Sequence, residues 1–515
     1  MKISAFKLTL FLFFSFFIIE VNAQTGISSV IAQTKDGTIS GYKSDDINIF
    51  KGIPFAAPPV GDLRWKAPQP VKPWNGLLDC TKFSASPYQD SPAPFMYWST
   101  EFLIPKEPIS EDCLYLNVWS KQSPQKKPVL IYIYGGGFRS GGTACAIYDG
   151  KAVAEKGVVF VSINYRVGVF GFLAHPDLTQ ESGYGASGNY ALLDMIAALQ
   201  WVKKNIAAFG GDPDQVTIAG QSAGAFAVSL LCASPKSRGL ISGAIAESGG
   251  SILSGKQRPT LDLKTAESNG VEYAKSLNCS SIADLRKKSA EEILKSNGGL
   301  SSPIIDGFVI PESLLEIYTK GHQNDVPVLL GWNGDDVVIS TKRPSSAEFI
   351  TQTQNTYGSN AAKLLQFYPA TNDSIAAKSA GDLNRDMTFG VQGYAWANIQ
   401  YKTGKAKVYV YNFNRKVPAY NSESSFGAFH SSEIVYAYDN LKTLNRPWEP
   451  VDKTLAGKMS AYWINFIKTG NPNGESLVKW PAFDSKNENI LILDQQIESR
   501  PLHTKDQLAF LETLY

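Results

Sequence analysis

Short apolar runs that alternate with helical patterns constrain the fold of this chain most. Each run is continuous and rich in β-forming residues, which is typical of a strand buried on both faces of a mostly parallel sheet. Between Asn189 and Phe209 the apolar residues instead recur at helical spacing, and Gly210-Gly211-Asp212-Pro213 ends that element. Strands that alternate with helices predict an α/β layered sheet. The predicted strands are 128–134, 158–163, 216–219, 244–246, 326–330, 408–413 and 490–493, and further helices are predicted after Ser222 to about Cys232 and over 455–468.

The length and charge of the chain narrow its class. It has 515 residues, 43% of them apolar, so it can bury a large core. A net charge of +2 gives no basic field for a nucleic-acid backbone, so nucleic acid is not an expected partner. A prior of about 150 residues per domain suggests three domains. However, no linker or repeat marks a boundary, so we predict a single domain over 24–515.

The N-terminus has the form of a cleaved export signal. Lys2 and Lys7 precede the apolar run 8–19, and Val21-Asn22-Ala23 supplies compact residues before Gln24. The alternative is a membrane anchor, but a run of about 12 apolar residues is shorter than the about 20 that a bilayer core needs. We therefore predict a signal peptide over 1–23, a secreted or periplasmic protein and no stable membrane anchor.

Five cysteines permit disulfides in an exported protein, and the odd number leaves at least one thiol unpaired. No pair of closely spaced cysteines and no His/Cys cluster indicates a zinc site. Cys80 and Cys113 both lie in loop-like N-terminal sequence, so they form the preferred bridge. The alternative is that all five are small core residues: Cys80, Cys113, Cys145, Cys232 and Cys279.

A G-x-S-x-G motif, Gly220-Gln221-Ser222-Ala223-Gly224, stands between a predicted strand and a predicted helix. Such a sharp turn holds its central residue in a strained conformation and exposes the Ser222 hydroxyl at the carboxyl edge of the sheet. By itself the pentapeptide is equally compatible with an ordinary turn. A second glycine-rich segment, Gly135-Gly136-Gly137-Phe138, directly follows the strand 128–134. Its spacing fits no phosphate-binding loop, but it suits backbone donors to an oxyanion, with Gly136, Gly137 and Ala223 as the expected donors.

A nucleophilic serine needs a base and an acid. Of the four histidines, His175, His322, His430 and His503, only His430 follows a late strand by a loop and fits the order serine, acid, histidine. The acid is expected just past the strand 326–330, where Asp335 and Asp336 stand side by side. The acid would fix the tautomer of the imidazole. The alternative for such a pair is a solvated turn.

These residues resemble the type B carboxylesterases and cholinesterases of the α/β-hydrolase fold over nearly the whole mature chain. The resemblance implies that Ser222 is the nucleophile, His430 the base, and Gly136, Gly137 and Ala223 the oxyanion donors. The motifs that carry it include Phe50-Lys51-Gly52-Ile53-Pro54, Ser110-Glu111-Asp112-Cys113-Leu114, Asn164-Tyr165-Arg166, Gly220-Gln221-Ser222-Ala223-Gly224, Glu247-Ser248-Gly249 and Gly470-Asn471-Pro472.

The sequence departs from the family at several of these positions. Asp336 occupies the place of the usual glutamate, so the resemblance favours Asp336 over Asp335 as the acid. Ser431 follows the histidine where glycine is usual, and Cys80 lies several residues before the expected partner of Cys113. Gln221 stands where cholinesterase-like members carry an acid, which removes a charge that would attract a cationic alcohol.

We therefore expect a serine carboxylesterase that hydrolyses small, uncharged esters through an acyl-enzyme, without metal or organic cofactor. A specialised hydrolase acting on feruloyl, lipid or carbamate substrates would use the same residues. A binding module without catalysis is the contrasting class, although such members typically lose the nucleophile or the base. The aromatic segment 95–98 is expected either to line the mouth of the site or to serve packing.

Overall fold

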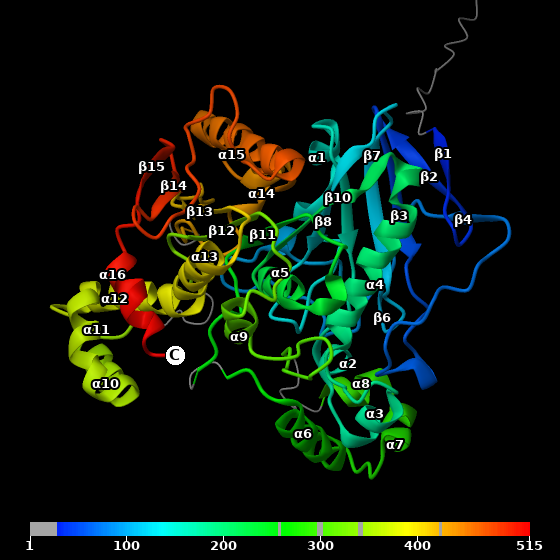
Figure 1. Cartoon of the computed structure of the whole chain (residues 1–515), viewed down its shortest axis with the longest axis horizontal. Coiled ribbons are helices and arrows are strands. Elements are labelled where there is room, and N and C mark those ends of the chain that lie inside the picture. The colour runs from blue at the N-terminus through cyan, green and yellow to red at the C-terminus, as the bar shows by residue number, and fades with distance from the viewer. Residues whose placement is uncertain (1–27, 256–258, 296–301, 338–342, 422–424) are drawn as a thin grey trace, which may run out of the picture.

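One large sheet organises the molecule. The computed structural model describes residues 28–255, 259–295, 302–337, 343–421 and 425–515 (Figure 1). Within these residues a sheet of 13 strands runs in the order β1-β2-β3-β7-β9-β8-β10-β11-β12-β13-β14-β15, with β4 paired to β2. The central strands from β9 to β14 are mutually parallel, while both ends of the sheet are antiparallel. The predicted α/β class and mostly parallel sheet are thus confirmed.

The observed strands agree with the predicted ones to within a few residues, except that β10 begins earlier than expected and β12 extends further. Both differences involve residues that look like turns in the sequence but pair with a neighbouring strand. The strands are β1 (Ser29–Gln33), β2 (Thr38–Ser44), β3 (Ile47–Pro54), β4 (Leu77–Asp79), β5 (Ser86–Pro87), β6 (Ile109–Ser110), β7 (Tyr115–Lys121), β8 (Lys127–Ile133), β9 (Val159–Ile163), β10 (Gly211–Gln221), β11 (Gly243–Glu247), β12 (Val328–Asn333), β13 (Val408–Phe413), β14 (Asn489–Leu493) and β15 (Glu498–Pro501).

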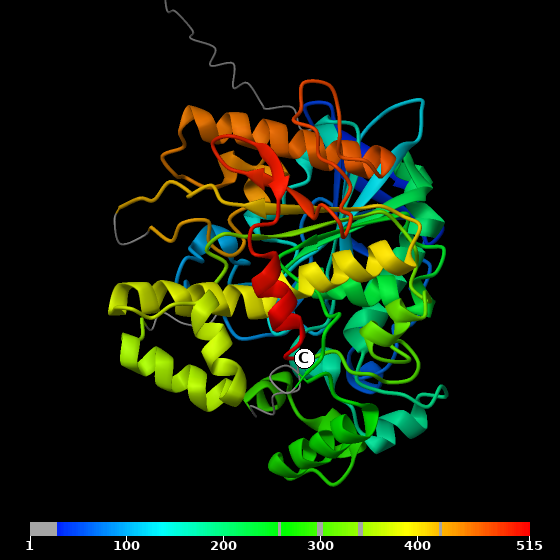
Figure 2. The same ribbon diagram turned by 60° about the vertical axis from the view of Figure 1, so that its left-hand side comes forward.

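Helices cover both faces of the sheet, with α5 and α13 on one side and α14 and α15 on the other (Figures 1 and 2). The three helices predicted from the sequence correspond to α4, α5 and α15. The helices are α1 (Lys151–Glu155), α2 (Gly168–Phe172), α3 (Pro176–Glu181), α4 (Tyr190–Asn205), α5 (Ala223–Ala233), α6 (Leu263–Ser276), α7 (Ile282–Lys287), α8 (Ala290–Lys295), α9 (Leu314–Thr319), α10 (Ser346–Tyr357), α11 (Ala361–Phe367), α12 (Asp373–Arg385), α13 (Val391–Thr403), α14 (Ile434–Ala437), α15 (Pro450–Thr469) and α16 (Lys505–Glu512).

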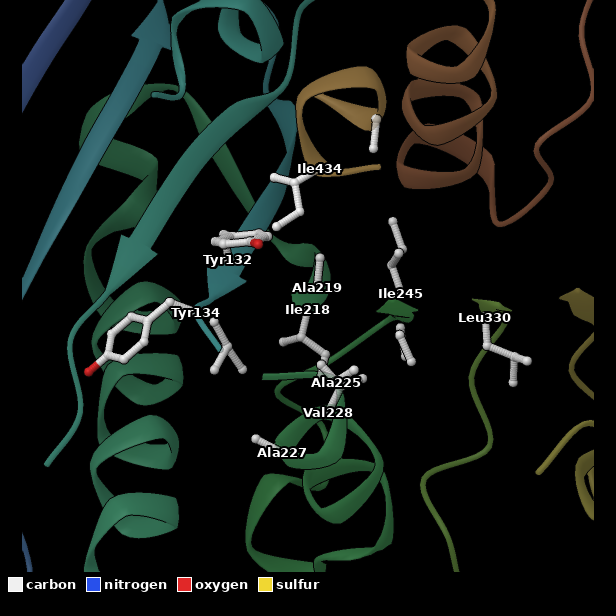
Figure 3. Close-up of a cluster of buried hydrophobic side chains, with 14 of the residues drawn as sticks. Tyr132, Tyr134, Ile218, Ala219, Ala225, Ala227, Val228, Ile245, Leu330 and Ile434 are labelled. Atoms are coloured by element: carbon white, nitrogen blue, oxygen red, sulfur yellow. The ribbon is translucent and has the colours of Figure 1, made fainter. Parts of the chain in front are cut away.

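The core lies between the sheet and these helices. In Figure 3, Ile218 of β10 points toward Ala225 and Val228 of α5, whereas Tyr132 of β8 and Ile434 of α14 lie on the opposite side of the strands. All five side chains are fully buried or nearly so. Burial on both faces explains why the central strands appear in the sequence as continuous apolar runs rather than as alternating ones.

The predicted disulfide between Cys80 and Cys113 is not formed, and all five cysteines are buried free thiols. Backbone hydrogen bonds hold Cys80 between β2 and β3, and its Sγ lies 3.9 Å from the carbonyl oxygen of Gly52. Cys113 instead lies close to Arg166 and Asp194. The two thiols therefore have different neighbours, and the alternative of five core cysteines describes the structure better.

The predicted signal peptide, 1–23, lies outside the described residues. Among the residues that are described, no helix has the length and apolar character needed to span a bilayer.

Helix α5 approaches the sheet more closely than ordinary side chains allow. A Cβ added at Gly224, in the first turn of α5, would lie 2.0 Å from the carbonyl oxygen of Ile133 at the end of β8. A Cβ added at Gly220, at the end of β10, would lie 2.5 Å from the backbone of Gly224. The two flanking glycines of the G-x-S-x-G motif therefore let backbone pack on backbone beneath Ser222.

We predict that Gly224→Ala lowers the free energy of unfolding by about 1–3 kcal/mol, because the helix must move away from β8 to admit a methyl group. The matched control is Gly457→Ala in α15, where an added Cβ meets nothing within 4 Å. That variant should be neutral or more stable by up to about 1 kcal/mol. Thermal unfolding of both variants checks the prediction, and equal melting temperatures would contradict it.

Candidate active site

The turn between β10 and α5 holds Ser222 in a strained conformation. Its backbone angles are φ 56° and ψ −124°, which few residues other than glycine adopt. The Ser222 N–H donates to the carbonyl oxygen of Glu247 at 2.9 Å, so the last residue of β11 helps to fix the turn. Ser222 also stands at the N-terminus of α5, where the helix dipole favours negative charge.

The glycine-rich loop after β8 lies against this turn. A Cβ added at Gly135 would lie 3.0 Å from the Cβ of Ser222. Gly136 and Gly137 have φ values of +112° and +63°, and the Gly136 carbonyl accepts the N–H groups of Arg139 and Ser140. Within the described part of the chain, the N–H groups of Gly136 and Gly137 donate to no other group. They are therefore available as donors beside the Ser222 hydroxyl.

A histidine and a carboxylate from two other loops form a buried pair. His430 Nδ1 lies 2.5 Å from Asp336 Oδ1, and both side chains are almost completely buried. The other oxygen of Asp336 accepts the backbone N–H of Asn333 at 3.0 Å. Asp336 thus receives hydrogen bonds at both oxygens, and one of them fixes the orientation of the imidazole.

Asp335 contacts the backbone before His430 rather than the imidazole itself. Its Oδ2 accepts the N–H of Ala428 at 2.9 Å, and its own N–H donates to the Ala428 carbonyl at 3.1 Å. It also packs against Gly427, at which a Cβ would lie 2.1 Å from the same oxygen. Asp335 therefore ties the loop after β12 to the loop that carries His430.

Two residues that the sequence did not single out complete this arrangement. The side-chain amide of Asn333 donates to the carbonyl oxygen of Phe429 at 2.8 Å and to Glu433 Oε2 at 2.5 Å, so it joins the two loops a second time. Phe389 stacks on the imidazole of His430 with ring centroids 4.8 Å apart. No local pattern marks either residue, because both act on groups far away in the sequence.

The aromatic segment 95–98 packs beside the same pair. The hydroxyl of Tyr97 donates to the carbonyl of Val337 at 2.7 Å, and the ring of Trp98 meets His430 edge to face at 6.1 Å. Phe95, at the outer end of the segment, is 58% exposed. The segment therefore both packs against the acid loop and borders the site.

The other three histidines lie on other elements. His175 caps the N-terminus of α3, where its Nδ1 accepts the N–H of Asp177. His322 stands between α9 and β12, and His503 precedes α16. Of the four, it is His430 that the fold brings next to the β10–α5 turn, with its ring beside Gln221.

A cavity of about 410 Å³ opens at Ser222. Phe389 lines it as well, which connects the cavity to the His430 ring. The lining side chains within the described residues are apolar or neutral polar, and none is charged. They include Phe138, Phe226, Leu230, Leu253, Ile305, Leu314 and Gln392. Ser222 Oγ makes no hydrogen bond to any described residue, and such contacts often tighten only when substrate binds.

Two further carboxyl groups are buried behind the pair. Burial raises the pKa of Glu247 to about 8, and the indole N–H of Trp463 donates to its Oε1 at 2.8 Å. Burial also raises the pKa of Glu433 well above its ordinary value, and the nearby Glu247 and Asp336 act in the same direction. Glu247 is therefore largely protonated near pH 7, and the raised pKa of Glu433 favours its protonated form. Across the described residues, no cluster of three or more His, Cys, Asp or Glu side chains could hold a metal ion.

The sequence pattern of the Carboxylesterase family matches residues 28–511. This chain belongs to that family. A similar protein is the fumonisin B1 esterase of Sphingopyxis macrogoltabida, which is 36% identical over 93% of this carboxylesterase chain and 89% of its own length. The para-nitrobenzyl esterase of Bacillus subtilis is 33% identical over 93% and 98% of the two chains. A solved structure of a PNB esterase superposes with a TM-score of 0.80 at 31% identity and covers 93% of this chain and 99% of its own. The α/β-hydrolase fold and the ester hydrolase class are thereby confirmed.

We predict that Glu247 makes the stability of this carboxylesterase depend on pH. Because the folded state raises the pKa of Glu247 from 4.5 to about 8, the folded chain binds this proton more tightly than the unfolded chain does. The resulting stabilisation, up to about 5 kcal/mol, is complete below pH 4.5 and is lost as the pH rises through 8. Glu247→Gln should remove this contribution, so its melting temperature should fall less between pH 5 and 8.5. Parallel pH profiles of melting temperature for both proteins would contradict the prediction.

Proposed function

We propose that this carboxylesterase is an exported serine hydrolase that cleaves small, uncharged carboxylic esters by two-step acyl transfer. Ser222 is the nucleophile, His430 the base and Asp336 the acid. The observation that carries the proposal is the buried hydrogen bond between His430 and Asp336, made beside a strained serine that opens into a neutral cavity. A serine, an imidazole and an orienting carboxylate are the parts that acyl transfer requires.

In the first step the Ser222 oxygen attacks the ester carbonyl carbon while His430 Nε2 accepts its proton. Asp336 holds Nδ1 as the protonated nitrogen, which leaves the Nε2 lone pair for this transfer. The negative charge that develops on the carbonyl oxygen is stabilised by the N–H groups of Gly136, Gly137 and Ala223. Each such donor contributes about 3 kcal/mol to lowering the barrier.

The imidazolium then returns its proton to the leaving alcohol, and the acyl group remains on Ser222. Water attacks this acyl-enzyme with His430 again as base, so the acid is released and the serine regains its proton. No step requires a metal ion or an organic cofactor.

The neutral lining of the cavity supports the choice of uncharged esters. A charged substituent would leave water without a compensating charge among the described lining residues, which costs several kcal/mol. Gln221 beside the nucleophile also offers no negative charge to a cationic alcohol. The volume of about 410 Å³ lies in the range of small-molecule sites. The signal-like sequence pattern over 1–23 supports a secreted or periplasmic location.

We predict that a fluorophosphonate probe modifies Ser222 of the folded protein. An activated serine attacks such a phosphorus centre, whereas an ordinary serine does not. Labelling should be abolished in Ser222→Ala, and peptide mass spectrometry should locate the adduct. Ser251→Ala, which removes another hydroxyl from the same cavity, is the matched control and should still be labelled. Absence of an adduct on Ser222 in the folded protein would reject the esterase mechanism and favour a binding module.

We predict that Asp336→Asn and Asp335→Asn have very different effects on kcat. An amide at 336 would favour the wrong tautomer of His430, so kcat for a neutral aryl ester should fall by about 10⁴-fold. The Asp335→Asn variant would retain a side-chain oxygen that can accept the Ala428 N–H, so its kcat should fall by less than about tenfold. A large loss confined to Asp335→Asn would assign the acid to Asp335 instead.

A further inference from the structure

Gln221 and Ser431, neither of which has a part in the acyl transfer itself, contact each other beside the base. The Ser431 hydroxyl donates to Gln221 Oε1 at 3.1 Å. Gln221 Nε2 lies 3.2 Å from His430 Nε2 and 3.4 Å from His430 Nδ1. Both side chains are at least 95% buried, so water does not replace these contacts.

The two distances locate the amide relative to the imidazole ring. An amide nitrogen that lay along the lone-pair axis of one ring nitrogen would be much farther from the other ring nitrogen. The nearly equal distances therefore place the Gln221 amide nitrogen off both lone-pair axes. The Nε2 lone pair of His430 is therefore not taken up by Gln221 and can still receive the Ser222 proton.

The contact with Ser431 shows which end of the amide faces the ring. The indole N–H of Trp98, which can only donate, lies 3.4 Å from Ser431 Oγ. The Ser431 oxygen can accept from Trp98 and still donate its own proton, and it donates that proton to Gln221 Oε1, an atom that can only accept. The amide nitrogen, with its partly positive hydrogens, is then the end that faces His430.

Ser431 holds this position at a conformational cost. Its φ is +76°, in the left-handed region that glycine adopts freely and a residue with a Cβ does not. Strained residues of this kind persist only where their surroundings over-determine them, and the Ser431 side chain contacts both Trp98 and Gln221. The strain is an observation independent of the hydrogen bonds.

We propose that Ser431 is a positioning residue that clamps the Gln221 amide nitrogen against the His430 ring, and that this clamp sets the acid-side limit of the pH range in which the enzyme is active. The inference rests on the proposed function. It follows because an N–H₂ group turned toward the ring opposes a positive charge on the imidazole, whereas a carboxylate or a rotated amide oxygen would stabilise that charge.

The other titratable groups around His430 do not oppose a positive charge on the imidazole. Asp336 faces Nδ1 and stabilises the imidazolium. On the loop of His430 itself, burial raises the pKa of Glu433 and so favours its neutral form, and burial raises the pKa of Glu247 at the end of β11 to about 8. In the helical segment Asp386–Gly390, which carries Phe389, the carboxylate of Asp386 accepts a hydrogen bond from Arg385 Nε at 2.8 Å. Helix α5 and the segment 95–98 contribute no charged side chain.

The test is the pH dependence of kcat/KM for a neutral aryl ester in the full chain. In Ser431→Gly the amide is free to rotate, so the acid-side midpoint should move to higher pH by about half a unit or more. Its melting temperature should be equal to or above that of the wild type, because glycine adopts this φ without strain. Ser432→Ala, which removes a neighbouring buried hydroxyl that has no described partner, is the control and should leave the midpoint unchanged.

Repeating the Ser431→Gly substitution in a Gln221→Leu protein separates the effect of the clamp from a general effect of changing position 431. In Gln221→Leu there is no amide to orient, so adding Ser431→Gly should produce no further shift of the midpoint. An unchanged midpoint in Ser431→Gly, or an equal shift in both backgrounds, overturns the proposal. Fluorophosphonate labelling of the wild type distinguishes failure of the proposed function from failure of the clamp. Without an adduct on Ser222 the proposed function itself is wrong. An adduct together with an unchanged midpoint in Ser431→Gly rejects only the clamp.

Discussion

The parallel register of four central strands is the constraint on which the site depends. Gln221 of β10 pairs with Glu247 of β11, Glu247 pairs with Gly331 of β12, and Gly331 pairs with Tyr411 of β13. The row crosses the sheet near its carboxyl edge, so the turns and loops that follow these strands all begin at the same level. Ser222, Asp336 and His430 therefore converge although each comes from a different part of the chain.

Convergence of the loops alone does not fix the positions of the catalytic side chains. Hydrogen bonds between the loops also hold them in place. Asn333 and Asp335 both bind the backbone of the segment before His430. The backbone N–H of Asn333 also holds Asp336, so one residue positions the acid and the loop of the base together. Glu247 and Glu433 are buried nearby, and burial raises both of their pKa values, which favours their neutral forms and limits the negative charge that would compete with Asp336.

The sequence predicted those parts of this arrangement whose cause is local. Apolar runs located the central strands because both faces of each strand are buried, and the glycines of the motif marked the turn because backbone packs on backbone there. The end of β12 was missed because Gly331-Trp332-Asn333 looks like a loop until β13 pairs with it. The disulfide prediction was wrong because loop-like sequence does not reveal which thiols face each other. Asn333 and Phe389 could not be found, because each acts on a residue that only the folded chain brings near.

The distribution of backbone strain connects the fold to the chemistry. Ser222, Ser248 and Ser431 all have positive φ values although none is glycine, and Phe138, which lines the cavity, does as well. Each residue follows or borders a strand end or loop of the site, where surrounding hydrogen bonds fix the backbone: Ser222 bonds to Glu247, and Ser248 bonds to Gly331. Such conformations cost about 1–3 kcal/mol each and persist only when their surroundings over-determine them. The paired parallel strands provide these surroundings. The strand pairing that stabilises the sheet therefore also holds the serines of the site in conformations that an isolated loop would not keep.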